Sequence, residues 1–139
     1  MSKNIKQKST IYEEYLEYYE KFKNKYGDKA VVLMQVGSFH EAYATETRGS
    51  NLFKLSELLN VVCTRKDKSI DKIDEKNPYM LGFPSVALSK FLKILVDNQY
   101  TVIIIDQTTP PPNPMHFNFL YIVYKKLTFL NIMITKQNV

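Results

Sequence analysis

The chain has 139 residues, which is enough for one domain with a buried core. Hydrophobic residues make up 45% and charged residues 24%, so the composition argues against disorder along the whole chain. The net charge of +5 permits binding to a polyanion, but it also fits a Lys-rich protein without such a role. Cys63 is the only cysteine, which excludes an internal disulfide and a cysteine-based metal site.

The N-terminal residues predict a polar arm followed by a helix. Residues 1–9 are Lys-rich without an apolar core, which predicts a disordered basic arm and argues against a secretory signal. Thr10 and Glu13 fit a capping box, and Gly27 is a suitable helix stop. Between them runs an apolar stripe at helical spacing, which we expect to pack on the domain rather than to stack on bases. Its members are Ile11, Tyr15, Tyr18, Tyr19, Phe22 and Tyr26.

The following segments alternate between strand-like and helix-like patterns. Residues 30–36 form a short apolar run typical of a strand that is buried on both faces. Residues 38–60 predict a mostly helical segment, interrupted near Gly49. A second strand is expected over residues 61–64, followed by a charged loop that ends at Asn77.

The second half of the chain repeats this alternation. A third strand is expected over residues 79–83, a long helix over 85–98 and a fourth strand over 100–106. The core face of that helix is predicted to comprise Val86, Leu88, Phe91, Leu92, Leu95 and Val96. The alternation predicts an α/β fold: a single domain with a mixed β-sheet flanked by helices.

A proline-rich segment separates this pattern from an apolar tail. Four prolines within residues 108–114 predict the end of the compact domain, which we place at residues 10–114. Residues 115–139 form an atypical apolar tail that we expect to form one or two β-strands. No apolar run approaches the length of a membrane span, so we expect no membrane partner.

Catalytic motifs are mostly missing. The sequence has no phosphate-binding loop, and neither His40 nor His116 has a partner at metal-ligand spacing. A nuclease would need clustered carboxylates to hold a divalent metal, and the candidates are Glu41, Glu46, Asp67, Asp71 and Asp106. A small metal-dependent nuclease built on Glu41 and Asp106 is kept as an alternative. Short acidic patterns arise by chance in a Lys-rich chain, so we predict no catalytic residue and no metal site.

Phe39 and Glu41 are the most informative pair of residues, because they follow Gly37 directly after an apolar run. One interpretation is structural: the aromatic ring fills the core, and the carboxylate favours the positive end of a helix. The other interpretation is that an aromatic wedge beside a carboxylate tests a base pair. Residue types alone favour the structural interpretation.

Four segments, in order along residues 15–112, resemble the N-terminal mismatch-recognition domain of the MutS family. Residues 36–43 are similar to the family's Gly-Asp-Phe-Tyr-Glu core, and residues 58–66 to its Leu-Leu-x-Ile-x-Leu-Thr-x-Arg/Lys strand. Residues 81–84 are similar to its Ala-Gly-Ile-Pro turn, and residues 102–107 to a strand ending in Glu-Gln. The resemblance ends after residue 114.

The sequence departs from the family pattern at three positions. Ser38 replaces the usual aspartate, His40 replaces an aromatic residue, and Val86 stands where the family often has histidine. Together with these departures, the proline-rich segment and the composition indicate a divergent branch of the family.

The resemblance implies a role for individual residues. Phe39 would enter the minor groove and stack on a mispaired base, while Glu41 would hydrogen-bond the displaced base. Arg65, Lys66 and Lys68 would contact the phosphate backbone, although a solvated basic turn is the alternative for these three. The implied partners are double-stranded DNA with mismatches and other mismatch repair subunits.

The resemblance also sets expectations for the whole chain. The connector, clamp and ATPase domains of the family are not recognisable in the sequence, so we expect a truncated, non-enzymatic member without a cofactor of its own. ATP and magnesium would act only if a missing ATPase domain is supplied. We expect a soluble intracellular protein, with a viral, organellar or nuclear version left open. The remaining alternative is an interaction domain or remnant that does not bind DNA.

Overall fold

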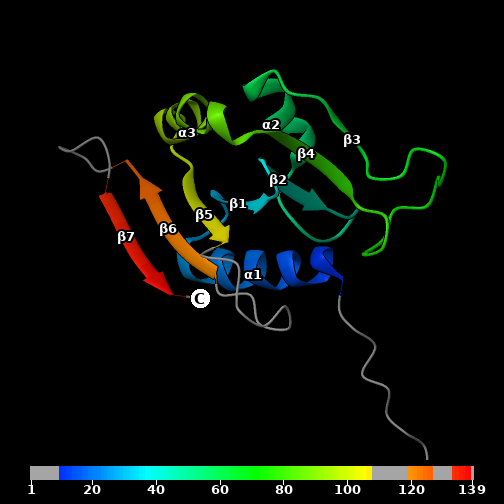
Figure 1. Cartoon of the computed structure of the whole chain (residues 1–139), viewed down its shortest axis with the longest axis horizontal. Coiled ribbons are helices and arrows are strands. Elements are labelled where there is room, and N and C mark those ends of the chain that lie inside the picture. Colours follow the sequence, from blue (N-terminus) through cyan, green and yellow to red (C-terminus); the bar gives the residue numbers. More distant parts are fainter. Residues whose placement is uncertain (1–9, 108–118, 127–132, 139) are drawn as a thin grey trace, which may run out of the picture.

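The computed structural model describes residues 10–107, 119–126 and 133–138 (Figure 1). The predicted basic arm and the proline-rich boundary lie outside the described residues. The strands are β1 (Ala30–Val36), β2 (Phe39–Ala44), β3 (Cys63–Arg65), β4 (Tyr79–Pro84), β5 (Thr101–Gln107), β6 (Phe119–Lys125) and β7 (Met133–Asn138). The helices are α1 (Ile11–Tyr26), α2 (Leu52–Leu59), the 3-10 turn η1 (Ser85–Ala87) and α3 (Leu88–Asp97).

These strands form one mixed sheet in the order β3-β4-β2-β1-β5-β6-β7. The central pair, β1 and β5, is parallel, whereas the other neighbouring pairs are antiparallel. The predicted α/β fold with a mixed sheet flanked by helices is confirmed. Both strands described within the apolar tail, β6 and β7, extend this same sheet beyond β5.

Helix α1 forms as its end signals predict. The Thr10 side chain accepts a hydrogen bond from the Glu13 backbone N–H at 3.2 Å, and Gly27 ends the helix with a φ of 91°. Tyr15 and Phe22 are fully buried, and α1 packs on β1 and β2. The expectation that the aromatic stripe packs on the domain is therefore confirmed.

The predicted helix over residues 38–60 is wrong in its first half. Gly37 and Ser38 form a two-residue loop that returns the chain as β2, antiparallel to β1. Gly37 has a φ of 59°, the conformation that tight hairpin turns require and that glycine adopts without strain. Only residues 52–59 are helical. The Gly-Ser pair after an apolar run was the signal for a hairpin.

Helices cover both faces of the sheet. On β2, Tyr43 packs edge-to-face against Tyr15 of α1, with ring centroids 5.2 Å apart. On β4, the ring of Phe83 packs against the ring of Phe91 of α3, with centroids 4.3 Å apart. Because Tyr43 pairs with Met80, side-chain alternation places Phe83 on the opposite face from Tyr43. Figure 1 accordingly shows α1 on one side of the sheet, with α2 and α3 on the other.

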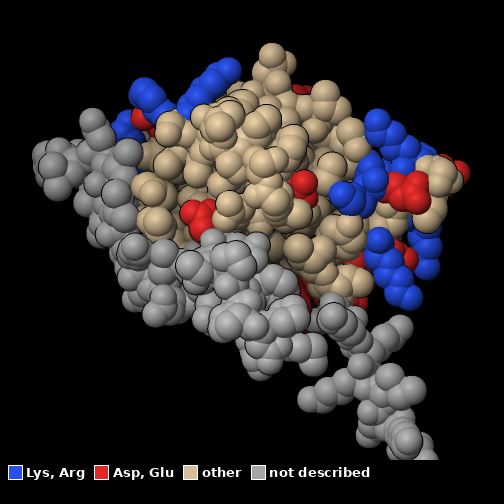
Figure 2. All heavy atoms as spheres, in the orientation of Figure 1, with Lys and Arg blue, Asp and Glu red and all other residues tan. Residues whose placement is uncertain are grey.

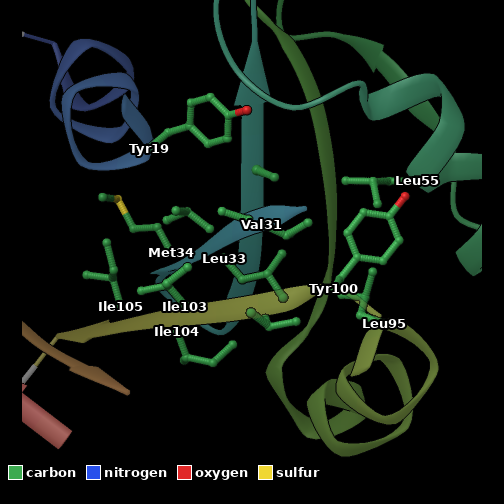
Figure 3. Packing of buried hydrophobic residues seen from close by; sticks show 14 of the residues in the cluster. Tyr19, Val31, Leu33, Met34, Leu55, Leu95, Tyr100, Ile103, Ile104 and Ile105 are labelled. Atoms are coloured by element: carbon green, nitrogen blue, oxygen red, sulfur yellow. The ribbon is translucent and has the colours of Figure 1, made fainter. Parts of the chain in front are cut away.

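The core is centred on β1 and β5. Residues 30–34 are at most 1% exposed, which confirms a strand buried on both faces. Figure 3 shows members of this strand beside the isoleucines of β5, with Tyr19 of α1 and Leu95 of α3 approaching from different sides. No helix among the described residues is long and apolar enough to cross a membrane.

The predicted helix over residues 85–98 is also corrected at its start. A 3-10 turn precedes α3, and Val86 within it is 97% exposed, so its placement in the core is wrong. The helical periodicity correctly predicts the core positions of Phe91, Leu95 and Val96, which are buried. Val86 falls before the first turn of α3, where helical spacing no longer determines which way a side chain points.

Candidate nucleic-acid interface

Phe39 is the first residue of β2, and its side chain is 42% exposed. It pairs with Val36 across the hairpin and with Pro84 of β4. The Ser85 N–H donates to the Ser38 carbonyl oxygen at 2.8 Å, which makes Phe39 and Pro84 a non-hydrogen-bonded pair with closely spaced side chains. The structural interpretation expected the ring to fill the core, and this expectation is wrong. The ring is presented at the end of the sheet.

Glu41 lies on the same face of β2 as Phe39, because the two are separated by one residue of a strand. It is half-buried and pairs with Gly82 of β4. A Cβ atom at Gly82 would lie 3.0 Å from the Glu41 Cγ, so glycine leaves the space in which this side chain rests. The structural interpretation of Glu41 as a helix-start residue is wrong, since it lies within a strand.

Tyr43 is a site residue that the sequence reasoning missed. Its hydroxyl donates a short hydrogen bond to Glu41 Oε2. Its ring is held edge-to-face by Tyr12 and Tyr15, with centroids 4.8 and 5.2 Å away. Burial, and then the Glu41 carboxylate, raise the pKa of Tyr43, so the hydroxyl stays a proton donor. The i,i+2 spacing would have revealed the pair if residues 39–44 had been predicted as a strand.

His40 points to the other face of the sheet and is 3% exposed. Its Nδ1 lies 2.8 Å from Ser85 Oγ, and its Nε2 lies 2.7 Å from Asp106 Oδ1. Both ring nitrogens therefore have hydrogen-bond partners, as buried polar groups normally do. The sequence analysis considered His40 as a metal ligand without a partner and as a departure from the family pattern, and it did not predict these two hydrogen bonds.

The proposed metal pair, Glu41 and Asp106, is not brought together. Met34 of β1 pairs with Glu41 on one side and with Ile105 on the other, so these three residues share a face. Asp106 is adjacent to Ile105 and lies on the opposite face, where it binds His40. The nuclease interpretation that rests on this pair is wrong.

The other candidate carboxylates have their own partners. Glu46 accepts from the Tyr79 hydroxyl at 2.7 Å, and Asp67 accepts from the Ser69 hydroxyl at 2.6 Å. Asp71 lies 3.6 Å from an Arg65 nitrogen. Within the described ranges, no three His, Cys, Asp or Glu side chains are grouped so as to hold a metal ion.

The predicted basic contacts lie at the other end of the sheet from Phe39. Arg65 pairs with Tyr79, whereas Phe39 pairs with Pro84. The five residue steps along β4 between these positions correspond to roughly 17 Å. Lys66 and Lys68 follow Arg65 and are exposed. Figure 2 shows one group of Lys and Arg at the right end of the visible face, with acidic side chains among them, and a second group at the upper left edge.

The loop that carries Lys66 and Lys68 is organised by Asn77, which is 4% exposed. The Asn77 side-chain oxygen accepts from the Asp67 N–H at 2.8 Å, and its Nδ2 donates to the carbonyls of Ile70 and Lys72 at 3.1 and 3.0 Å. These bonds give the basic loop a defined shape in spite of its high charge.

Together, these features define a site with an exposed aromatic ring and an oriented carboxylate on one hairpin, and a separate basic loop. The family model for MutS domain I matches residues 13–131, so the chain belongs to the MutS domain I family. The predicted resemblance is confirmed, and the match continues past residue 114, where we expected it to end.

Individual relatives agree with this assignment. The chain is 42% identical over 102 residues to a putative DNA mismatch repair protein, a mutS homolog, of Acanthamoeba polyphaga mimivirus, covering 72% of the chain and 9% of that protein. It is 32% identical over 96 residues to the DNA mismatch repair protein MutS of Thermotoga neapolitana, covering 69% and 10%. The same figures apply to MutS of Petrotoga mobilis. The matched region thus spans about a tenth of these relatives.

Proposed function

We propose that this chain is a DNA-binding module that recognises mispaired or unpaired bases in duplex DNA, as a part of DNA mismatch repair. One observation carries the proposal: in a member of the MutS domain I family, Phe39 is 42% exposed on the same strand face as Glu41, whose carboxylate is held by Tyr43. The names of the relatives support the same role.

Phe39 acts as a wedge between neighbouring bases. Inserting an apolar side chain into a base step costs a few kcal/mol of unstacking. A mispaired or looped-out base has already lost part of its stacking and pairing, so insertion beside it costs less. The wedge therefore responds to local weakness of the duplex rather than to base sequence. The two-residue turn before Phe39 supports this role, because it keeps the wedge close to the rigid sheet.

Glu41 adds selectivity against intact DNA. A carboxylate close to phosphates is unfavourable, because both groups are anionic. The Tyr43 hydroxyl engages Oε2 and leaves Oε1 to bond an edge atom of the displaced base. In an intact duplex no base is displaced toward Glu41, so its desolvation and repulsion are not compensated.

Arg65, Lys66 and Lys68 supply affinity without reading sequence. Their separation from Phe39 by the length of β4 suits contacts to phosphates away from the mismatch. Such contacts depend strongly on salt and contribute equally to matched and mismatched DNA.

The proposed role of this domain is limited to the recognition of mispaired or unpaired bases. Any step that uses ATP and magnesium is assigned to other domains or to other mismatch repair subunits. The domain alone is therefore expected to bind DNA weakly and without turnover.

Fluorescence anisotropy with a matched duplex, a G·T duplex and a duplex with one unpaired base tests the proposal. The 139-residue chain should prefer the two imperfect duplexes, and Phe39→Ala should abolish this preference. Phe53→Ala is the matched control, since Phe53 is 54% exposed but lies on α2. Equal affinity for all three duplexes, unchanged in Phe39→Ala, would overturn the proposal.

A further inference from the structure

A partly buried series of hydrogen bonds, centred on the buried His40 side chain, links three elements next to Phe39. It runs from Ser85 in η1 through His40 on β2 to Asp106 on β5, with separations of 2.8 and 2.7 Å. We propose that His40 is a positioning residue for Phe39: together with Ser85 and Asp106, it fixes the backbone on both sides of the wedge. This inference rests on the proposed function, because it concerns how the wedge is presented.

Both neighbours of Phe39 are bonded to the same residue. The Ser38 carbonyl accepts from the Ser85 backbone N–H at 2.8 Å, and the His40 ring bonds the Ser85 side chain at 2.8 Å. Side-chain alternation directs the Phe39 ring to the opposite face from His40. His40 therefore acts on Phe39 only through the backbone, by holding residues 38 and 40 to the start of η1.

The direction of the hydrogen bonds follows from the chemistry of the three groups. An ionised carboxylate only accepts, so His40 Nε2 carries the proton that it donates to Asp106. In the neutral imidazole, Nδ1 is then an acceptor for the Ser85 hydroxyl. With a neutral ring, both hydrogen bonds run toward Asp106 and strengthen one another. With a protonated ring, Nε2 still donates to Asp106 while Nδ1 donates to the Ser85 hydroxyl oxygen, so both bonds are present in either state.

The hydrogen bonds of His40 also connect the backbone next to Phe39 to the centre of the sheet. His40 and Asp106 lie on β2 and β5, with β1 between them. The His40 side chain thus connects the hairpin end to a strand that does not pair with it, in addition to the β2–β4 ladder. Holding the hairpin end in one conformation lowers the entropy that Phe39 loses on insertion. It also keeps the ring from adapting to an intact base step.

A double-mutant cycle tests the inference. Ser85→Ala removes the hydroxyl but keeps the backbone N–H that bonds Ser38. We expect the ratio of mismatched to matched affinity to fall about five-fold, as for the loss of one hydrogen bond. In the Phe39→Ala background, Ser85→Ala should cause no further change in this ratio. Ser89→Ala, at an exposed position of α3, is the control.

A second pair of variants guards against a general loss of folding. Asp106→Asn keeps an oxygen that accepts from His40 Nε2 and should retain the ratio, whereas Asp106→Ala should lower it. An unchanged ratio in Ser85→Ala and Asp106→Ala, or an effect of either that persists fully without Phe39, overturns the positioning role. If Phe39→Ala itself leaves the ratio unchanged, the proposed function fails first, and the positioning role fails with it.

Discussion

The Tyr43 hydroxyl donates a hydrogen bond to the carboxylate of Glu41, which lies two positions earlier on the same face of β2. Tyr43 is 1% exposed, and its ring is enclosed by two tyrosines of α1, so the hydroxyl can reach few other partners. The bond selects one orientation of the Glu41 carboxylate beside Phe39. The packing of α1 on the sheet is thereby connected to the geometry of the proposed base contact.

Tyr43→Phe should lower mismatch preference while leaving the affinity for matched DNA almost unchanged. The substitution removes only the hydroxyl, so Glu41 loses its orientation but keeps its charge. A hydrogen bond to a charged group contributes roughly 1.5–3 kcal/mol, which predicts a loss of at least about ten-fold in the affinity ratio. Anisotropy titrations measure this ratio. Tyr12→Phe, which keeps the ring contact with Tyr43, should behave like the wild type.

Glu41→Gln should raise the affinity for matched DNA, because it removes a negative charge close to the phosphates. The affinity for mismatched DNA should change less, since the amide can still bond a base edge. The selectivity then falls chiefly through tighter binding of intact duplex. Parallel titrations of both duplexes at one salt concentration check this expectation. A matched-duplex affinity that stays the same would contradict the repulsion argument for Glu41.

The double variant Lys66→Ala and Lys68→Ala should weaken binding to matched and mismatched DNA equally. Each lost phosphate contact should reduce the slope of log K against log salt by about 0.9. The slope is measured from titrations at several salt concentrations. Lys25→Ala, at an exposed position of α1, provides the control and should leave the slope unchanged. A selective effect on the mismatched duplex would place these lysines near the wedge instead.

Gly82→Ala should destabilise the fold less than Gly49→Ala. At Gly82 the new Cβ approaches the Glu41 Cγ at 3.0 Å, and a side chain can shift at a cost of about 1 kcal/mol. At Gly49 it would lie 2.7 Å from the Tyr43 carbonyl oxygen, with a φ of +94°, so backbone must move and about 3 kcal/mol or more is expected. Urea unfolding gives both free energies. Gly82→Ala should also lower mismatch preference through Glu41.

Local sequence pattern was sufficient for elements whose ends carry chemical signals. Thr10, Glu13 and Gly27 bound α1 as predicted, and the apolar run of residues 30–36 is β1. The same local reasoning failed over residues 38–44, which it assigned to a helix. A single glycine turn reverses the chain there, and six residues are too few for periodicity to separate a strand from a helix.

Phe39 and Glu41 were recognisable in the sequence because an aromatic residue and a carboxylate, one residue apart after Gly37, resemble a family motif. The environment of these two side chains could not be recognised in the sequence, because it depends on residues that lie far apart along the chain. Gly82 lies under Glu41 only through the pairing of β2 with β4, and Asp106 reaches His40 only because β1 and β5 are parallel neighbours. Pairing register and side-chain alternation also separate Glu41 from Asp106, so only the folded sheet decides that these carboxylates cannot share a metal.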